Sequence, residues 1–415
     1  AMYYKRACEN TIKEMMKSFP AIAVYGPRQC GKSTMLNMLF NDSIESVTLD
    51  DIDELNLAQS NPKLFLDSHP VPIIIDEIQK APVLLEEIKR RIDLKKLEWL
   101  KKSEPYQLLY IINGSNQFEL SQGISDSLAG RIGIVELNTF SLSEKLSLPC
   151  TLFQPEIDEL RKKENIPVFT KKEIFNHIFQ GGMPEIVTQK ADRNIYFKSY
   201  LETYLEKDVS KLISVGNKTA FLNFISYLAY WTAQEINYND ISSSIGIDVK
   251  TVKRWLSILE ASHLIVFLQP FMKNVSNRII KAPKLYFMDT GLASYLCGWP
   301  NAQMLENCAM SKAFYETFVV SEIIKTFLYH NEDYRHNLFF YRDIDQKEID
   351  IIYEKNQEIY PIEIKKGIRP TKPNKNFNVL EKFKLPIKTG LIIDSTDKIR
   401  PINEKVYTIP IGLIE

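Results

Sequence analysis

The sequence has little cysteine, and this scarcity excludes two kinds of structural site. Its 415 residues include five cysteines, an odd number, and no two of them form a Cys-x-x-Cys pair. We therefore expect neither a disulfide framework nor a zinc site. Scattered free thiols are typical of a reducing compartment, so a cytoplasmic location is expected.

Long apolar runs are also missing. No uninterrupted apolar stretch approaches the roughly 18 residues that a membrane-spanning helix needs. The first ten residues, AMYYKRACEN, lack the apolar centre of a signal peptide. We expect no membrane partner.

An excess of charge of either sign is absent as well. Lys plus Arg and Asp plus Glu number 52 each, which excludes a globally basic nucleic-acid binder but leaves a local basic face open. Hydrophobic residues make up 45% and charged residues 25%, as in globular proteins, and the length favours several domains.

A glycine-framed loop dominates what is present. Residues 26–34 read GPRQCGKST, between the apolar run FPAIAVYG and the helically spaced KSTMLNMLF. Strand, Gly-x-x-x-x-Gly-Lys-Ser loop and helix form the context of a P-loop, whose amides and helix N-terminus attract phosphate. We expect Lys32 to reach the β- and γ-phosphates, Ser33 to ligate Mg²⁺ and Thr34 to hold the α/β region of ATP.

All nine residues of this loop are predicted to form the nucleotide site. They are Gly26, Pro27, Arg28, Gln29, Cys30, Gly31, Lys32, Ser33 and Thr34. For Cys30 we favour a passive small residue over a redox switch.

Two acidic residues follow a second apolar run, VPIIIDEIQ. Asp76 suits the Mg²⁺ shell, and Glu77 can polarise the attacking water. The alternative is an N-cap pair for the next helix. With the loop residues, the predicted metal ligands are Ser33 and Asp76.

A third run, YQLLYIINGSNQF, ends in Asn113, where a polar group can sense the γ-phosphate. With ESVTLDD and RIGIVELNTF there are five strands separated by helices, which predicts a parallel α/β sheet with the ligand at the strand C-termini.

The Asp-Glu pair and the extra polar-tipped strand resemble the additional-strand P-loop ATPases that include AAA proteins. That resemblance makes Arg131, just before the fifth strand, a candidate finger for a neighbour's γ-phosphate and implies self-association. The alternative for Arg131 is an ordinary helix-end arginine.

The sequence after residue 150 changes character in two steps. Residues 151–216 read as a helical lid over the nucleotide, in which Tyr196, Tyr200 and Tyr204 recur as a packing stripe. Residues 217–297 follow the order helix, helix, turn, helix and hairpin, with cap-like residues around Asn237 and at Asp248, which is typical of a winged helix.

Basic residues lie on the two elements that contact duplex DNA in winged-helix proteins. The third helix carries Lys250, Lys253 and Arg254. The hairpin carries Lys273, Arg278, Lys281 and Lys284. Double-stranded DNA is therefore a candidate partner. The alternative is a module that docks proteins and leaves these cations solvated.

Residues 298–415 carry an acid and lysine pattern on a hairpin. If EKNQ is a four-residue loop, Tyr353 pairs with Glu358, and Asp350 lies opposite Pro361. Glu363 is then a diagonal same-face neighbour of Asp350.

The pattern Asp…Glu-x-Lys, on a hairpin that follows a helix carrying an acidic residue, resembles the PD-(D/E)XK nuclease fold. The resemblance assigns Asp350 and Glu363 to Mg²⁺, Lys365 to water, and Glu316 to the helix acid, because Glu322 points to another helix face. The alternatives are a solvated strand face or a nuclease-like module that does not cut.

The motifs together resemble one prokaryotic AAA-type ATPase family. They are GPRQCGKST, IIIDEIQ, NGSNQF, SLAGR, GGMPE, SYLETYLEKDVSKL, YFMDTGLASYL and FYETFVVSEI…PIEIKKG. The C-terminal half of that family carries a domain of unknown function, with a winged helix and a nuclease-like end. The resemblance implies an ATP- and Mg²⁺-dependent ATPase acting on DNA or nucleoprotein, with Lys32, Glu77, Asn113 and Arg131 as catalytic residues. Asn113 departs from the threonine that relatives often carry. The alternative function is a nucleotide switch that binds a protein partner through a silent nuclease-like adaptor.

Overall fold

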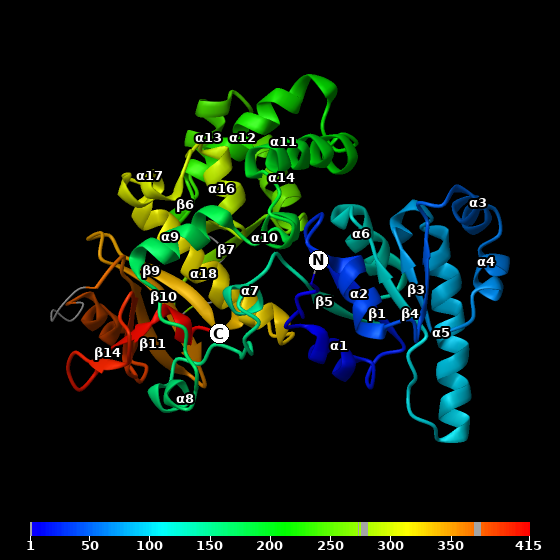
Figure 1. The fold of residues 1–415 in the computed structure, drawn as a ribbon, viewed down its shortest axis with the longest axis horizontal. Coiled ribbons are helices and arrows are strands. Elements are labelled where there is room, and N and C mark those ends of the chain that lie inside the picture. Colours follow the sequence, from blue (N-terminus) through cyan, green and yellow to red (C-terminus); the bar gives the residue numbers. More distant parts are fainter. Residues whose placement is uncertain (1, 273, 275–280, 369–374) are drawn as a thin grey trace.

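A computed structural model describes residues 2–272, 274, 281–368 and 375–415. A smaller parallel sheet near the N-terminus and a larger mixed sheet near the C-terminus lie on opposite sides, with helices between and above them (Figure 1). Within the described residues, no helix combines the length and the apolar character needed to cross a lipid bilayer.

The N-terminal unit is an α/β layer structure. Its strands are β1 (Ala21–Tyr25), β2 (Glu45–Thr48), β3 (Ile73–Asp76), β4 (Tyr110–Asn113) and β5 (Ile132–Glu136). Its helices are α1 (Glu9–Met15), α2 (Lys32–Phe40), α3 (Ile52–Ser60), α4 (Pro62–Ser68), η1 (Ile78–Lys80), α5 (Val83–Lys102), α6 (Gln117–Ser127) and α7 (Leu142–Lys145).

The five predicted strands are confirmed, and all pair in parallel in the order β2-β3-β4-β1-β5. Strand β4 lies between the loop-bearing β1 and the acidic β3, as in the additional-strand class. Parallel pairing brings the C-terminal ends of β1, β3 and β4 to one edge, where the predicted site residues follow.

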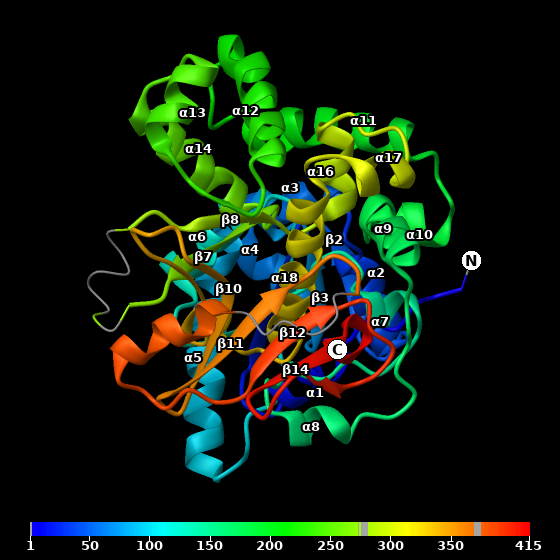
Figure 2. The ribbon, with the colours of Figure 1, turned by 90° about the vertical axis from the view of Figure 1, so that its left-hand side faces the viewer.

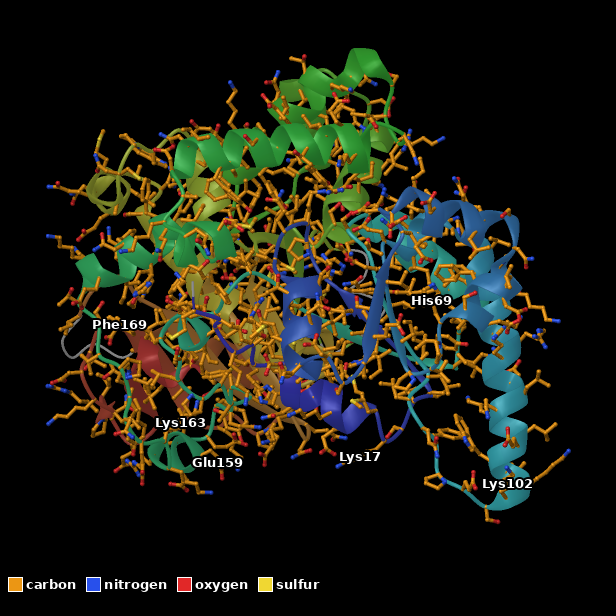
Figure 3. The ribbon with its side chains drawn as sticks, turned by 45° about the vertical axis from the view of Figure 1, so that its right-hand side comes forward. Lys17, His69, Lys102, Glu159, Lys163 and Phe169 are labelled. Carbon is orange, nitrogen blue, oxygen red and sulfur yellow. The ribbon has the colours of Figure 1, made fainter. Side chains whose placement is uncertain are left out.

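Alternating apolar residues of these strands build a core on each face of the sheet. In β1, Ala21 and Ala23 pack on one face with α3 to α6, whereas Ile22 and Val24 pack on the other with α1 and α2. Helix α5 extends beyond the sheet, with Lys102 at its tip (Figure 3).

The next segment is helical, as expected for residues 151–216. It contains α8 (Ile157–Arg161), α9 (Lys171–Gln180), α10 (Pro184–Thr188), α11 (Arg193–Tyr204), the π-helix η2 (Leu205–Val209) and η3 (Val215–Asn217). Tyr200 and Tyr204 are buried in its core, and Tyr196 packs partly against it.

The described residues of the range 217–297 form four helices and three antiparallel strands. The elements are α12 (Lys218–Tyr230), β6 (Gln234–Glu235), α13 (Tyr238–Ile245), α14 (Val249–Ala261), β7 (Ile265–Pro270), β8 (Lys284–Phe287) and α16 (Thr290–Leu296). Asn237 and Asp248 cap α13 and α14 through their side chains, as the sequence predicts. The two-residue strand β6 was not anticipated.

The C-terminal elements complete a nine-stranded sheet. They are α17 (Ala302–Asn307), α18 (Ser311–Tyr329), η4 (Tyr334–His336), β9 (Leu338–Arg342), β10 (Glu348–Lys355), β11 (Glu358–Ile364), η5 (Lys375–Phe383), β12 (Gly390–Asp394), β13 (Arg400–Pro401), β14 (Val406–Pro410) and η6 (Ile411–Leu413). The strand order is β13-β14-β12-β11-β10-β9-β7-β8-β6, and β7 pairs in parallel with β9. The sheet therefore runs without interruption across the expected domain boundary at residue 297.

The predicted register of the β10–β11 hairpin was wrong. Lys355 pairs with Glu358, and Tyr353 pairs with Tyr360, so the loop has two residues instead of four. Its residues Asn356 and Gln357 have φ of 52° and 60°, which suits a type I′ turn. A shift of two residues keeps every side chain on its face, and Glu363 moves directly opposite Asp350.

Helix α18 joins the two sheets (Figures 1 and 2). At its C-terminal end the Tyr329 hydroxyl donates to Thr139 O at 3.0 Å, and Tyr329 O accepts from Thr11 Oγ1 at 2.6 Å. Its earlier turns pack under the larger sheet, so one helix fixes the two units relative to each other.

Candidate nucleotide site and carboxylate cluster

The loop between β1 and α2 has the backbone that its glycines predict. Gly26 has φ of 152°, and a Cβ there would lie 1.9 Å from Leu137 O. Gly31 has φ of 98° and forms the N-cap of α2. Both positions thus favour glycine, and the α2 amides remain available to an anion.

Lys32 folds back onto this loop. Its Nζ donates to Gly26 O at 2.9 Å and to Pro27 O at 2.8 Å, and the side chain is buried. Thr34 is exposed one residue beyond Ser33. Cys30 is buried, which agrees with a passive small residue.

Three predicted polar residues meet at the C-terminal edge of the sheet. Ser33 Oγ donates to Asp76 Oδ2 at 2.8 Å, and Asn113 Nδ2 donates to Ser33 Oγ at 3.3 Å. Asn113 Oδ1 is buried without a hydrogen-bond partner among the described residues. Burial raises the pKa of Asp76, and its Ser33 hydrogen bond opposes that shift. An orphaned oxygen beside a hydroxyl and a carboxylate fits a hydrated Mg²⁺, which prefers oxygen ligands.

Glu77 is held beside this group by two residues that the sequence analysis missed. Ser115 donates to it from its backbone N–H at 3.1 Å and from its hydroxyl at 2.9 Å. Gln79 Nε2 donates at 2.5 Å. Glu77 has φ of 58°, an uncommon conformation for a residue other than glycine. The position of Ser115 after the Asn113 strand was the available signal.

Arg28 and Gln29 reach from the loop to the helical segment. Arg28 forms a two-bond ion pair with Asp208 of η2, through Nε to Oδ2 at 2.9 Å and through Nη2 to Oδ1. Gln29 Oε1 accepts from the Tyr196 hydroxyl at 2.8 Å. A cleft of about 910 Å³ lies alongside, lined by residues including Arg28, Glu77 and Asp208.

Arg131 lies away from its own chain's P-loop. It directly precedes β5, which runs parallel to β1, so it sits at the amino-terminal edge of the sheet. Its Nε and Nη2 donate to the Asp93 carboxylate at 2.7 and 3.0 Å. This arrangement leaves a role toward a neighbouring copy as a prediction.

A second cluster combines three carboxylates and a lysine from β8, β10 and α18. Glu316 of α18, Glu348 and Asp350 each place a carboxylate oxygen within 4.8 Å of the others. Lys284 Nζ donates to Glu316 Oε1 at 2.7 Å and to Glu348 Oε1 at 2.5 Å. Lys284 is only 3% exposed. Its assignment to a DNA-facing hairpin was therefore wrong, because the acids of this cluster bind it in the interior.

Glu363 and Lys365 border the same cluster. Lys365 Nζ donates to Glu363 Oε1 at 2.7 Å, and Glu363 Oε2 is buried without a hydrogen-bond partner among the described residues. Burial, with Glu316 and Glu363 nearby, raises the pKa of Asp350 well above its usual value. The predicted quartet of Glu316, Asp350, Glu363 and Lys365 is thus brought to one place.

Glu322 faces elsewhere, as the helix geometry predicts. Its Oε2 accepts from the Leu142 backbone N–H at 2.8 Å.

Of the predicted DNA-facing cations, Lys250 and Lys253 are exposed on α14. Lys253 Nζ lies 5.1 Å from the centre of the Tyr238 ring. Arg254 is exposed but donates to Leu212 O of the helical segment. Lys281 is exposed, while Lys273 and Arg278 lie outside the described residues.

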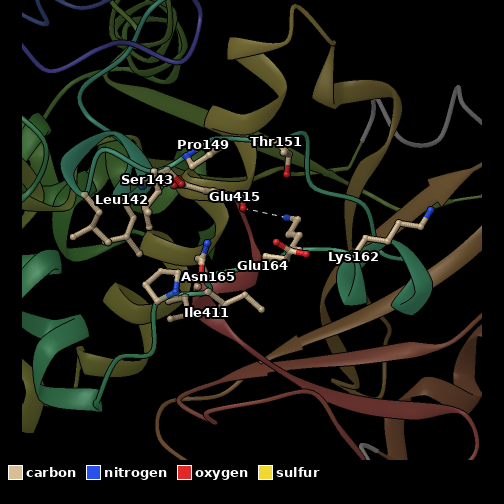
Figure 4. A pocket seen from close by; sticks show the side chains of 15 residues that line it. Leu142, Ser143, Pro149, Thr151, Lys162, Glu164, Asn165, Ile411 and Glu415 are labelled. Atoms are coloured by element: carbon tan, nitrogen blue, oxygen red, sulfur yellow. Dashed lines mark hydrogen bonds between the residues drawn. The ribbon is translucent and has the colours of Figure 1, made fainter.

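A separate cavity of about 430 Å³ lies between α7 and the last residues of the chain (Figure 4). Lys163 Nζ donates to Leu413 O at 2.7 Å and Glu415 O at 3.1 Å, and Ser143 N donates to the Glu415 side chain. This cavity marks a contact between the two units, and it is lined by none of the predicted site residues in the described part of the chain.

A five-stranded parallel sheet with a P-loop, an acid pair after β3 and a polar residue after β4 defines the additional-strand class of P-loop ATPases. Residues 18–146 match the family model of an AAA domain. The N-terminal part of the chain therefore carries an AAA-type domain. Residues 171–303 match a domain of unknown function (DUF8612), and residues 311–414 match another (DUF4143).

Two uncharacterized proteins, from Mycobacterium bovis and Mycobacterium tuberculosis, are each 25% identical over 372 residues. The match covers 88% of this chain and 75% of each relative. A Walker-type ATPase of Pyrococcus abyssi aligns with a TM-score of 0.43 at 15% identity, over 71% of this chain and 96% of that one. The ORC2 protein of Aeropyrum pernix aligns with a TM-score of 0.35 at 11% identity, over 72% and 93%.

Proposed function

We propose that the chain binds and hydrolyses ATP at the β1–α2 loop. The observation that carries this proposal is the meeting of Ser33, Asp76 and Asn113 beside a restrained Glu77. A loop that only binds phosphate needs no carboxylate aimed at a water, whereas hydrolysis does.

The residues divide the work by their positions. Ser33 and Asp76 would hold Mg²⁺, which neutralises charge on the phosphates when bound. The α2 amides and Lys32 bind phosphate oxygens, once Lys32 leaves the carbonyls of its own loop. Glu77 orients a water, and Ser115 and Gln79 keep its carboxylate in place. Asn113 donates to an oxygen at the end of the triphosphate.

Two variants test this assignment in the purified full chain. Lys32→Ala should abolish turnover by weakening ATP binding. Glu77→Gln should retain binding and lose at least about 100-fold in turnover, because a polarising base is removed. Phosphate release measured against ATP titration separates the two effects. Turnover that survives Lys32→Ala would contradict the proposal.

We further propose that residues 217–297 form a winged helix that contacts duplex DNA through α14. The element order and the exposed Lys250 and Lys253 support this. A double variant, Lys250→Ala with Lys253→Ala, should weaken duplex binding. The slope of the logarithm of the binding constant against the logarithm of salt concentration should also fall by the contribution of about two phosphate contacts. Lys284→Ala is not a suitable test, because that lysine is internal.

The buried Lys284 favours a second candidate for the C-terminal unit, a nuclease-like adaptor that does not cut. Its ammonium already bonds Glu316 and Glu348, two of the three clustered acids that could hold a divalent ion together. Mg²⁺- or Mn²⁺-dependent nicking should then be absent in wild type. Nicking that is present in wild type and lost in Asp350→Asn would reverse this assignment.

A further inference from the structure

The P-loop contains two cations, and oxygen atoms of the chain itself engage both. Lys32 bonds two carbonyls of its own loop. Arg28 bonds both carboxylate oxygens of Asp208, and both side chains of this pair are mostly buried. A two-bond guanidinium–carboxylate pair uses the same donor face that would bind a phosphate. Both cations of the loop are thus already hydrogen-bonded within the chain, Lys32 by loop carbonyls and Arg28 by a carboxylate of the helical segment.

Asp208 stands close to the groups that we assign to ATP. It is 8% exposed and lines the same cleft as Glu77 and Ser115. Burial raises the pKa of Asp208, and the charges of Arg28, Lys32 and Glu77 also act on it. A triphosphate in the loop would therefore place like charge near the Asp208 carboxylate.

We infer that Asp208 is an internal competitor of ATP, which occupies Arg28 in the nucleotide-free protein and yields that guanidinium to a phosphate when ATP binds. This inference rests on the proposed function of the P-loop. The Arg28–Asp208 pair is called the latch below.

The latch also connects the ATP site to the proposed DNA-binding helix. Asp208 lies in η2, a π-helical turn. Such turns are rare in proteins, and those that occur are often found at functional sites. On either side of it, the Tyr204 hydroxyl and Ser262 Oγ lie 2.9 Å apart, and Leu212 O accepts from Arg254 of α14. Release of Asp208 would shift the segment that contacts α14 near its middle, at Arg254, and at its C-cap, Ser262.

A purely structural pair would behave differently from a competing one. If the latch only holds the fold together, breaking it from either side should loosen the site and weaken ATP binding. If Asp208 competes with ATP, removing its charge should tighten binding, whereas removing Arg28 should weaken it.

The test titrates the full chain with a fluorescent, non-hydrolysable ATP analogue in Mg²⁺. Asp208→Asn should bind about tenfold more tightly than wild type, a change equal to about 1.4 kcal/mol. Arg28→Gln should bind more weakly than wild type. The matched control is Glu202→Gln, the same carboxylate-to-amide change on an exposed position of α11, which should leave affinity unchanged.

Hydrogen exchange provides a readout that does not depend on affinity. In wild type, ATP should increase exchange in residues 204–212 and alter it in α14. Both Asp208→Asn and Arg28→Gln should show the faster exchange without nucleotide. If Asp208→Asn binds the analogue as wild type does, or more weakly, the inference is overturned while ATP binding stands. If wild type does not bind the analogue, the proposed function itself fails.

Discussion

Lys284 and Glu316 form a buried ion pair, with Nζ and Oε1 2.7 Å apart and side-chain exposures of 4% and 7%. The lysine comes from β8, in the segment 217–297, and the glutamate comes from α18, the helix beneath the C-terminal strands. Burial by itself lowers the pKa of Lys284. The negative charge of Glu316, with its neighbouring groups, outweighs burial, so the pKa of Lys284 lies well above its usual value. The ammonium therefore stays charged and joins the two segments electrostatically.

Replacing Lys284 by methionine should destabilise the chain strongly. The methionine keeps the length of the side chain but leaves Glu316 and Glu348 without their cation, which typically costs about 3–5 kcal/mol. Urea unfolding followed by circular dichroism measures this as a lower midpoint. The control, Lys102→Met, breaks the exposed pair with Glu98 and should leave the unfolding midpoint nearly unchanged. Equal midpoints for the two variants would show that Lys284 is not a needed counter-ion.

Asp350→Asn should stabilise the chain at alkaline pH and lose that advantage in acid. Because burial and nearby acids raise the pKa of Asp350, the folded state holds its proton more tightly than the unfolded state. Stability from this group is present below the ordinary aspartate pKa of about 3.9 and is lost as pH rises toward the raised value. Asparagine remains uncharged and can still accept from the Ile364 backbone N–H, which bonds Asp350 Oδ2 at 2.8 Å.

Thermal unfolding between pH 5 and pH 8 measures this difference. The apparent Tm of Asp350→Asn should exceed that of wild type by roughly 2 °C at pH 8, and the gap should narrow toward pH 5. Asp345→Asn, at an exposed position in the loop before β10, should show no such gain. A gap that widens in acid would give the opposite sign and contradict the argument.

Gly26→Ala should impair the nucleotide loop more than its backbone conformation alone would explain. The added Cβ would meet Leu137 O at 1.9 Å, so the loop or the end of β5 must move. Gly130→Ala is the matched control, because Gly130 also has positive φ, at 76°, but has no atom within 4 Å of the added Cβ. The control should lose about 1 kcal/mol of stability and keep ATP affinity. Equal losses of affinity in both variants would place the effect in backbone strain instead of the contact.

The sequence was sufficient for features that are local in the chain. The five strands, the glycine loop and the Asn237 and Asp248 caps each depend on residues a few positions apart, and all are present. The convergence of Ser33, Asp76 and Asn113 also followed, because parallel strands place their C-terminal ends at one edge.

Features that depend on distant or atypical residues did not follow. Arg28 and Asp208 are 180 positions apart, and nothing near either one marks the other as its partner. The hairpin turn uses Gln357 at positive φ, where glycine is the usual signal, so its loop was read as too long. Lys284 was read as exposed because lysine is seldom buried without an ionic partner, and Glu316 lies 32 positions away.

Arg131 offers the sharpest test of self-association. Its ion pair with Asp93 is half exposed on the aspartate side, with side-chain exposures of 28% and 46%, so its loss should change stability by less than about 1 kcal/mol. If Arg131 acts on a neighbour's ATP, Arg131→Ala should nevertheless lower turnover by about 1000-fold, the scale of an arginine finger. Asp93→Asn, which breaks the same pair but keeps the arginine, should preserve turnover.

Mixing two inactive variants separates action in trans from a local defect. Arg131→Ala retains its own ATP site, and Glu77→Gln retains its arginine. In a mixed assembly, Glu77→Gln subunits can supply Arg131 to the intact sites, so turnover should reappear when the two are combined. Mixing Arg131→Ala with an Arg131→Ala, Glu77→Gln double variant should restore nothing, because neither partner supplies the arginine. Full turnover by Arg131→Ala alone would instead make this residue a surface arginine that serves only its pair with Asp93.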